Sequence, residues 1–338
     1  MKSFDLNPDY NNIKNTLLTN ELGRNKFLFR FISLLQSIDD MNCSIALDAQ
    51  WGAGKTFFVK QAKLVFDAIN PYIETDKLTE ELKNDCKKII NLVEGYGIKD
   101  NPQLCVYYNA WENDNDDDPI LSLIYSIANN ISTEIKITEG KRDLGAIIQS
   151  IVSLINVQIN IPLDSTNQNS MSFGIDGQRI NDVVDAFKKK KDFGTIEHEK
   201  KLKREMNEFL NSLLPEKANR LVIFIDELDR CKPLYAVKLL ERIKHYYDNN
   251  NITFVFSTNL SELKNTINNL YGEQFNASKY LDKFFDITLQ LPQLNIEKYF
   301  NYLGFGSNSI STLVRIRIAE VFNLGLREIN RLLKNTFI

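Results

Sequence analysis

Residues that commonly bind transition metals are scarce in this sequence. It contains two histidines, and its four cysteines lie far apart, at Cys43, Cys86, Cys105 and Cys231. Zinc sites need several histidine or cysteine ligands, usually within short motifs. The sequence therefore argues against a zinc site and predicts reduced, mostly buried thiols, as is usual in a cytoplasmic protein.

Long hydrophobic runs are also missing. The best candidate for a membrane span, Leu144 to Leu163, is interrupted by Gln149, Asn156 and Asn160, whereas a bilayer-spanning helix needs about 20 mostly apolar residues. The opening residues, Met1 to Tyr10, are polar and do not resemble a secretory signal peptide. From these features we expect a cytoplasmic protein without a transmembrane segment.

A strong net charge of either sign is absent as well. The 338 residues carry a formal net charge of −3, and 43% of them are hydrophobic and 25% charged. This is the composition of a globular protein, and the chain is long enough for one large α/β domain and a smaller one. Nucleic acid stays possible as a partner, but no overall positive charge indicates it.

The most informative segment runs from Ser44 to Lys60, with the sequence SIALDAQWGAGKTFFVK. Its first residues, Ser44 to Leu47, form a short apolar run that is typical of a buried strand. The glycine-containing stretch Gln50 to Gly54 predicts a loop. After Lys55, apolar residues recur at helical spacing, at Phe58, Ala62, Val65 and Phe66. A strand, a loop and a helix joined by Gly-Lys-Thr are the features of a phosphate-binding loop.

Each residue type in such a loop has a chemical reason. Gly52 and Gly54 tolerate positive φ, so that backbone N–H groups can point at phosphate oxygens where the helix begins. Lys55 would reach the β- and γ-phosphates of ATP, and the Thr56 hydroxyl would bind Mg2+. Ala49 replaces the first glycine of the usual motif, which weakens the match. The predicted nucleotide-binding residues are Trp51, Gly52, Ala53, Gly54, Lys55, Thr56 and Phe57.

A second motif lies in the segment Leu221 to Cys231, LVIFIDELDRC. Its apolar run predicts a fully buried strand of a parallel sheet, which ends at Asp226 and Glu227. This is the Walker B pattern, in which Asp226 would hold Mg2+ through water and Glu227 would act as general base. The two motifs in this order predict the core of a P-loop NTPase.

Polar residues also follow the strand predicted over Ile252 to Phe256. A side chain at the carboxyl end of this strand would face the γ-phosphate beside the Walker B acids, and Asn259 or Thr258 fits this position. A further candidate, Arg327, lies in the first turn of a C-terminal helix that opens at Gly325. Arg327 could reach back to the nucleotide, or it could lie on the surface of that helix.

Arg230 and Lys283 are cations that cannot be assigned to the phosphates of their own subunit from sequence. A positive charge that reaches a neighbouring subunit's γ-phosphate can accelerate hydrolysis strongly. Alternatively, Arg230 could form a salt bridge with Asp226 or Asp229. The candidate catalytic residues are Glu227, Lys55, Asn259, Arg230 and Arg327, and the candidate metal ligands are Thr56 and Asp226.

The flanking segments carry weaker signals. Asn7 to Ile38 contain a polar lead and a predicted amphipathic helix, preceded by Leu22-Gly23-Arg24. In P-loop proteins of this type a segment here often packs beside the adenine, and a helix that only covers the sheet edge is the alternative. Further on, Asp118 and Pro119 predict the start of a helix. The acidic residues before it do not match a calcium loop.

An insertion is predicted between the two motifs, from about Glu139 to Pro215. Val157 to Ile161 and Met171 to Ile175 are predicted to form a hairpin, and Ile180 to Leu214 a charged helix. The lysine run Lys188 to Lys191 could grip nucleic acid or anionic lipid. The alternative is a solvated helix whose lysines are offset by nearby acidic residues.

Taken together, the motifs resemble the KAP family of P-loop NTPases. The resemblance rests on four blocks: QWGAGKT, YYNAWENDNDDDPILSLI, FIDELDRCKP, and YLDKFFDITLQLP with LREINRLL. It implies an additional-strand (ASCE) core and ATP hydrolysis, and often membrane association through inserted apolar helices, which this insertion lacks. Bacterial relatives include phage-exclusion proteins, so the resemblance also implies a role in defence or signalling.

The predicted fold is an α/β, parallel-sheet P-loop NTPase core of the ASCE type. Its expected parts are an N-terminal helical segment (1–40), the core in two halves (41–138 and 216–292), the insertion (139–215) and a small C-terminal helical lid (293–338). We expect a Mg2+-dependent ATPase that drives assembly, as a homo-oligomer or with a partner protein, or a conformational switch. The alternative is a scaffold that binds ATP, hydrolyses it negligibly and presents its insertion to a partner.

Overall fold

The computed structural model describes residues 7–39, 41–70, 79–98, 101–116, 118–134, 203–208, 214, 218–246, 250–305 and 309–334. The chain divides into two compact units. The first comprises Met1–Trp111, Ala218–Cys231 and Asn250–Ile338, and the second comprises Glu112–Lys217 and Lys232–Asn249. The sheet and the residues predicted to bind the nucleotide belong to the first unit.

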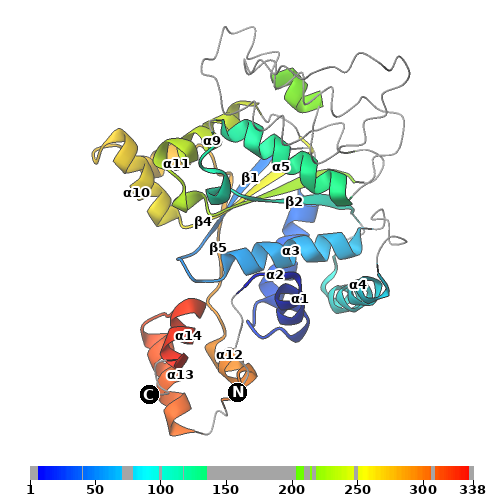
Figure 1. The fold of residues 1–338 in the computed structure, drawn as a ribbon, viewed down its shortest axis with the longest axis vertical. Helices are drawn as coiled ribbons and strands as arrows, with labels where there is room; N and C mark the ends of the chain where they lie inside the picture. The colour runs from blue at the N-terminus through cyan, green and yellow to red at the C-terminus, as the bar shows by residue number, and fades with distance from the viewer. Residues whose placement is uncertain are drawn as a thin grey trace, which may run out of the picture. The chain divides into compact units, whose positions relative to one another are not determined.

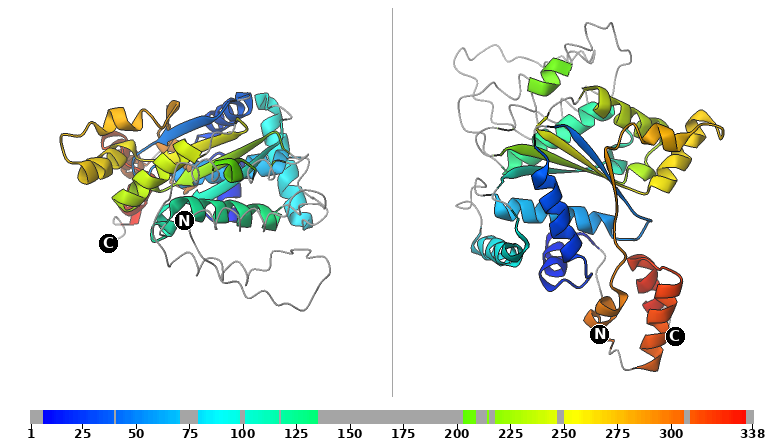
Figure 2. Two further views of the ribbon diagram at one scale, coloured as in Figure 1. Left: turned by 90° about the horizontal axis from the view of Figure 1, so that it is seen from above. Right: turned by 180° about the vertical axis from the view of Figure 1, so that it is seen from behind.

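A five-stranded parallel sheet forms the centre of the first unit, in the order β2-β3-β4-β1-β5 (Figures 1 and 2). Strand β4 lies between the strand that precedes the phosphate loop and the strand that ends in the Walker B acids. This additional strand defines the ASCE type, so the predicted fold class is confirmed. The strands span Cys43–Asp48 (β1), Gln103–Asn109 (β2), Arg220–Asp226 (β3), Ile252–Thr258 (β4) and Ile287–Gln290 (β5).

The apolar runs of β3 and β4 explain their central positions. Each of these strands is buried at all seven of its residues. Continuous runs of β-branched and aromatic residues suit strands that are buried on both faces. Strand β5 instead alternates between half-buried and exposed residues, as suits an edge strand.

The register brings the polar ends of four strands to one edge of the sheet. Asp226 at the end of β3 pairs with Asn109 on one side and Ser257 on the other, and Asp48 of β1 pairs with Thr258. In open parallel sheets, ligands bind outside the carboxyl ends of the strands. This edge is therefore where a nucleotide site is expected.

Four helices of the first unit pack together with β1 and the neighbouring strands around the main hydrophobic core. They span Tyr10–Thr19 (α1), Asn25–Ser37 (α2), Lys55–Ile69 (α3) and Glu80–Val93 (α4). The polar lead that precedes the predicted amphipathic helix contains helix α1. Its side chains Ile13, Thr16 and Leu17 form a buried stripe at helical spacing, and the Asp9 carboxylate caps its first turn.

Three helices follow β5 and share a second hydrophobic core, which also includes Leu22 from the N-terminal segment. They span Ile296–Tyr302 (α12), Ile310–Val321 (α13) and Leu326–Lys334 (α14). Two further helices, α10 (Leu260–Tyr271) and α11 (Ala277–Leu281), lie between β4 and β5. Helix α14 begins close to Gly325, where the sequence predicted a helix start.

The second unit contains α5 (Pro119–Glu134) and α9 (Pro233–Tyr246), which contact each other. Helix α5 begins at Pro119, as predicted, and the Asp118 carboxylate accepts a hydrogen bond of 2.9 Å from the Ile120 N–H. Its other oxygen lies 3.7 Å from the Arg242 guanidinium of α9. Among the described residues, no group of three or more acidic, histidine or cysteine side chains is arranged to hold a metal ion.

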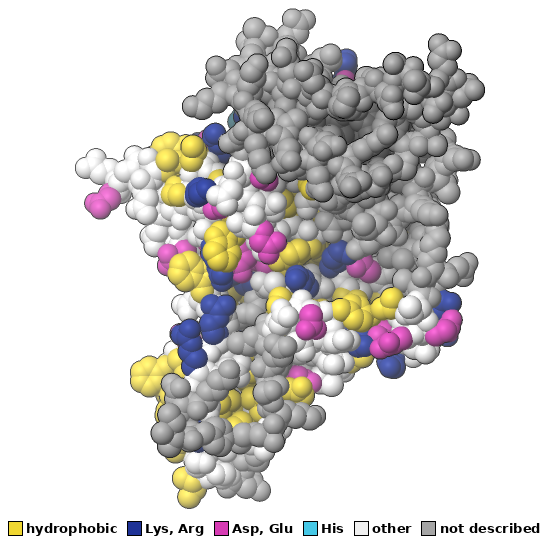
Figure 3. Space-filling model, in the orientation of Figure 1, with side chains coloured by type: hydrophobic (Ala, Val, Ile, Leu, Met, Phe, Trp, Pro, Cys, Tyr) yellow, Lys and Arg dark blue, Asp and Glu magenta, His cyan; other side chains and the backbone are white. Residues whose placement is uncertain are grey.

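The predicted hairpin and the lysine run of the insertion lie outside the described residues, so both stay predictions. Within the described part of the chain, no helix combines the length and apolar character needed to cross a bilayer. Figure 3 shows acidic and basic side chains next to one another on the described part of one face. This mixture agrees with the small net charge of the sequence.

Candidate nucleotide-binding site

The phosphate loop connects β1 to α3 through a tight turn. The Ala53 N–H donates to the Gln50 carbonyl at 3.2 Å, and Gly52 and Gly54 have φ angles of +79° and +89°. These angles are strained for any residue with a side chain, which explains both glycines. Ala49 continues the pairing with β4 through its N–H and keeps a negative φ, so alanine in place of the usual first glycine causes no strain.

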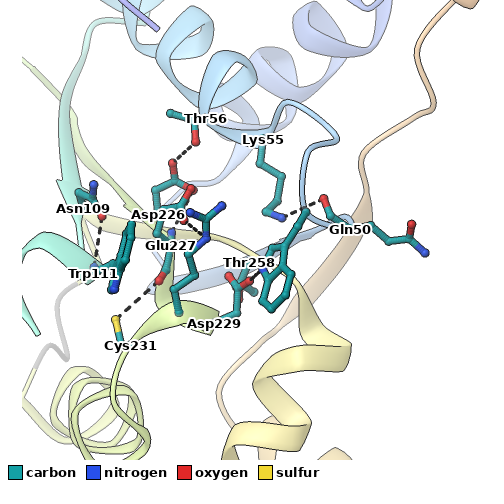
Figure 4. Close-up of polar contacts among 12 residues, drawn as sticks. Gln50, Lys55, Thr56, Asn109, Trp111, Asp226, Glu227, Asp229, Cys231 and Thr258 are labelled. Atoms are coloured by element: carbon teal, nitrogen blue, oxygen red, sulfur yellow. Dashed lines mark hydrogen bonds and ion pairs between the residues drawn. The ribbon is translucent and has the colours of Figure 1, made fainter. Parts of the chain in front are cut away.

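Lys55 points back into this loop from the first residue of α3 (Figure 4). Its ammonium donates to the carbonyls of Ala49 at 2.7 Å and Gln50 at 3.3 Å. Burial lowers the pKa of Lys55, while the nearby charges of Asp229, Asp226 and Glu227 act in the opposite direction. The ammonium is thus held inside the loop, where phosphate oxygens could replace the two carbonyls.

Asp226 joins the phosphate loop to the Walker B strand. Its Oδ2 accepts hydrogen bonds from the Thr56 hydroxyl at 2.7 Å and from the Tyr107 hydroxyl at 2.9 Å, and its Oδ1 accepts one from the Glu227 N–H at 3.1 Å. The structure thus brings together Thr56 and Asp226, the two predicted metal ligands. Hydroxyl and carboxylate oxygens are the ligands that Mg2+ prefers, so these residues fit that ion.

Glu227 has an unusual backbone conformation at the end of β3. Its φ of +62° lies in the left-handed region, which costs a non-glycine residue on the order of 1–2 kcal/mol. Such strain is concentrated at functional sites. Burial and the charge of Asp226 raise the pKa of the Glu227 carboxyl, while Arg230 lowers it.

Arg230 forms an ion pair with Glu227 in its own chain. The sequence left a salt bridge with Asp226 or Asp229 as the alternative to a contact with a neighbouring subunit, and the structure shows Glu227 as the partner instead. The spacing explains the difference, because residues three apart in the short helical turn after β3 lie side by side. The guanidinium also lies 5.4 Å from the ring centre of Trp111, a cation–π contact.

Asp229 makes contacts that were not predicted from the sequence. Its carboxylate is buried and accepts a hydrogen bond from the Trp51 indole of the phosphate loop. Its second oxygen accepts one from the Thr258 hydroxyl at 3.0 Å. One acidic side chain therefore connects the loop, the turn after β3 and the end of β4 (Figure 4).

Thr258 and Asn259, the two alternatives for the γ-phosphate position, both lie at the end of β4. The Asn259 Oδ1 caps α10 by accepting from the N–H groups of Ser261 at 3.2 Å and Glu262 at 3.4 Å. Because that oxygen is occupied, only the Asn259 amide nitrogen could approach a phosphate. The choice between the two residues stays a prediction.

Two other segments contact the outside of the phosphate loop. The Leu326 N–H at the start of α14 donates to the Gly52 carbonyl at 3.0 Å, and a Cβ on Gly325 would lie 2.9 Å from that oxygen. The buried Arg24 guanidinium donates to the Ala53 carbonyl at 2.6 Å, and burial lowers the pKa of Arg24 to about 10. Arg327, which follows Leu326 in α14, is exposed.

The chain is similar to a known protein family and to known proteins. A family model described as "KAP family P-loop domain" matches residues 24–304. An uncharacterized protein of Methanocaldococcus jannaschii is 29% identical over 168 residues, which cover 44% of this chain and 86% of that protein. The Aeropyrum pernix ORC2 protein, solved in ADPNP-ADP complexes, aligns with a TM-score of 0.35 and 12% identity over 86% of this chain and 50% of that chain.

The family match covers most of the chain. It includes the phosphate loop, the Walker B strand β3, and β4, which lies between β3 and β1 in the sheet. The chain spans half of the length of the ORC2 chain. The resemblance predicted from the sequence motifs is confirmed: the chain belongs to the KAP family of P-loop NTPases.

Proposed function

We propose that this protein is a Mg2+-dependent ATPase that uses ATP binding and hydrolysis to drive assembly or a conformational switch. The observation that supports this most directly is the 2.7 Å hydrogen bond between Thr56 and Asp226, which joins the phosphate loop to the Walker B acid. Bound Mg2+ would neutralise charge on the β- and γ-phosphates. Thr56 and Asp226 would hold it, and Lys55 would bind the same phosphates.

Glu227 is the proposed general base, since it follows Asp226 directly and carries a carboxyl group whose pKa is raised. Its ion pair with Arg230 must open or rearrange before the carboxylate can accept a proton from the attacking water. Arg327 and Asn259 are proposed to contact the γ-phosphate from α14 and β4. The proposed biological role, in bacterial defence or signalling, rests on the family resemblance.

The Glu227–Arg230 pair also favours a second function, a scaffold that binds ATP without hydrolysing it. Phosphate release from Mg2+-ATP by the purified protein separates the two, with binding measured by calorimetry in the same samples. Steady release supports the ATPase. Binding without release, both alone and after concentration to promote assembly, supports the scaffold. Absence of binding contradicts both.

Tyr107→Phe is expected to raise the Mg2+ concentration needed for half-maximal ATPase activity by about 3- to 10-fold. The phenol donates to Asp226 at 2.9 Å, and one hydrogen bond to a charged group is worth about 1.5–3 kcal/mol, only part of which acts on the metal site. Phenylalanine preserves the ring under Lys60, whose ammonium lies 4.8 Å from the ring centre.

The measurement is a Mg2+ titration at saturating ATP, with Tyr10→Phe as the control. Tyr10 also donates its hydroxyl to an aspartate, Asp85, through a hydrogen bond of 3.3 Å. Neither of these two residues belongs to the candidate site. An unchanged Mg2+ requirement in Tyr107→Phe would show that the phenol does not position Asp226.

A further inference from the structure

Asp229 has no part in the functions assigned above, although it contacts both the phosphate loop and the end of β4. It lies in the short helical turn after β3, and its two oxygens accept hydrogen bonds from Trp51 and Thr258. The carboxylate is only 5% exposed. A buried charge needs nearby compensation, because desolvation is costly.

The ammonium of Lys55 is a source of that compensation: it donates to the carbonyls of Ala49 and Gln50 in the loop that also carries Trp51, and the charge of Asp229 acts on it. The phosphates of a bound nucleotide would compete for the same ammonium. ATP carries one phosphate group more than ADP, and Lys55 would bind this γ-phosphate as well as the β-phosphate. ATP would therefore place more negative charge near Asp229 than ADP, and like charges in a poorly solvated site repel each other.

We propose that Asp229 is a positioning residue that couples the γ-phosphate to the phosphate loop: it holds Trp51 in the absence of the γ-phosphate and releases it when ATP binds. This inference rests on the proposed nucleotide-binding function. Trp51 is suited to such a change because it lies at the tip of the turn and is 49% exposed. A released tryptophan is a common anchor in protein interfaces, which would connect ATP binding to assembly.

Intrinsic fluorescence can test this directly, because the chain has two tryptophans. Trp111→Phe leaves Trp51 as the only indole. In this variant, Mg2+ with a non-hydrolysable ATP analogue is expected to shift the Trp51 emission to longer wavelength, since the indole moves from a carboxylate into water. Mg2+-ADP is expected to leave the emission close to that of the nucleotide-free protein.

Asp229→Asn in the same background is expected to give the same emission with both nucleotides. Asparagine keeps the size and one acceptor oxygen but carries no charge for the γ-phosphate to repel. Glu227→Gln is the matched control: it removes a neighbouring charge without a contact to Trp51, and should preserve the difference between the nucleotides. Loss of the difference in Glu227→Gln would overturn the specific role of Asp229.

Calorimetry on each sample distinguishes failure of this inference from failure of the proposed function. If neither nucleotide binds, the nucleotide-binding function is wrong. If both bind and the Trp51 emission of Trp111→Phe is the same with either, Asp229 does not respond to the γ-phosphate, although the function stands. This comparison needs no substitution of Asp229, so it decides the question even if Asp229→Asn does not fold.

Discussion

Replacing Lys55 with alanine is expected to abolish ATP binding. The ammonium lies in the phosphate loop, where it donates to two backbone carbonyls of that loop. Charge-assisted hydrogen bonds contribute about 1.5–3 kcal/mol each. The loss of contacts to both the β- and γ-phosphates should therefore weaken binding by a factor on the order of 10²–10⁴.

The measurement is calorimetric titration with Mg2+-ATP, and Lys63→Ala is the matched control. Lys63 lies in the same helix, but it pairs with Asp67 at 2.8 Å instead of facing the loop. Lys55→Ala also removes a positive charge that interacts with Asp226 and Asp229, so a thermal melt must show that the variant is folded. Wild-type affinity in folded Lys55→Ala would exclude the loop as the phosphate site.

The phosphate loop and the Walker B strand could be predicted because each is a local pattern. Glycines that need positive φ, and an apolar run that ends in two acids, are visible within a few residues. The order of the two motifs then fixes the class of core. The additional strand was implied by the resemblance to the KAP family, and the structure confirms it as β4, which lies between β1 and β3.

Contacts between strands and loops could not be predicted in this way. Tyr107 reaches Asp226 because β2 lies beside β3 with Asn109 opposite Asp226, and a single sequence does not contain that register. The contact between Trp51 and Asp229 likewise depends on the helical turn after β3.

The sequence around Asn259 contains a helix-start pattern that was not considered when Asn259 was predicted to contact the γ-phosphate. An asparagine followed three residues later by a glutamate, here Glu262, is typical of a helix start. The structure shows Asn259 as the cap of α10. Its proposed contact with the γ-phosphate now depends on the amide nitrogen alone.

Glu227→Gln is expected to slow ATP turnover by ~10²-fold or more, the usual effect of losing a general base, while ATP binding is preserved. Burial and Asp226 raise the pKa of this carboxyl, which makes it a stronger base than an exposed glutamate. Single-turnover phosphate release with pre-bound ATP measures the chemical step without interference from product release.

Glutamine also removes the ion pair with Arg230, so the loss of the base must be separated from the loss of the pair. Arg230→Gln breaks the same pair and keeps the carboxylate. If Glu227 is the base, Arg230→Gln should retain far more activity than Glu227→Gln, because a freed carboxylate can still accept the proton. An equal loss in both variants would show that turnover depends on the pair itself, and turnover equal to that of the wild type in Glu227→Gln would show that Glu227 is not the base.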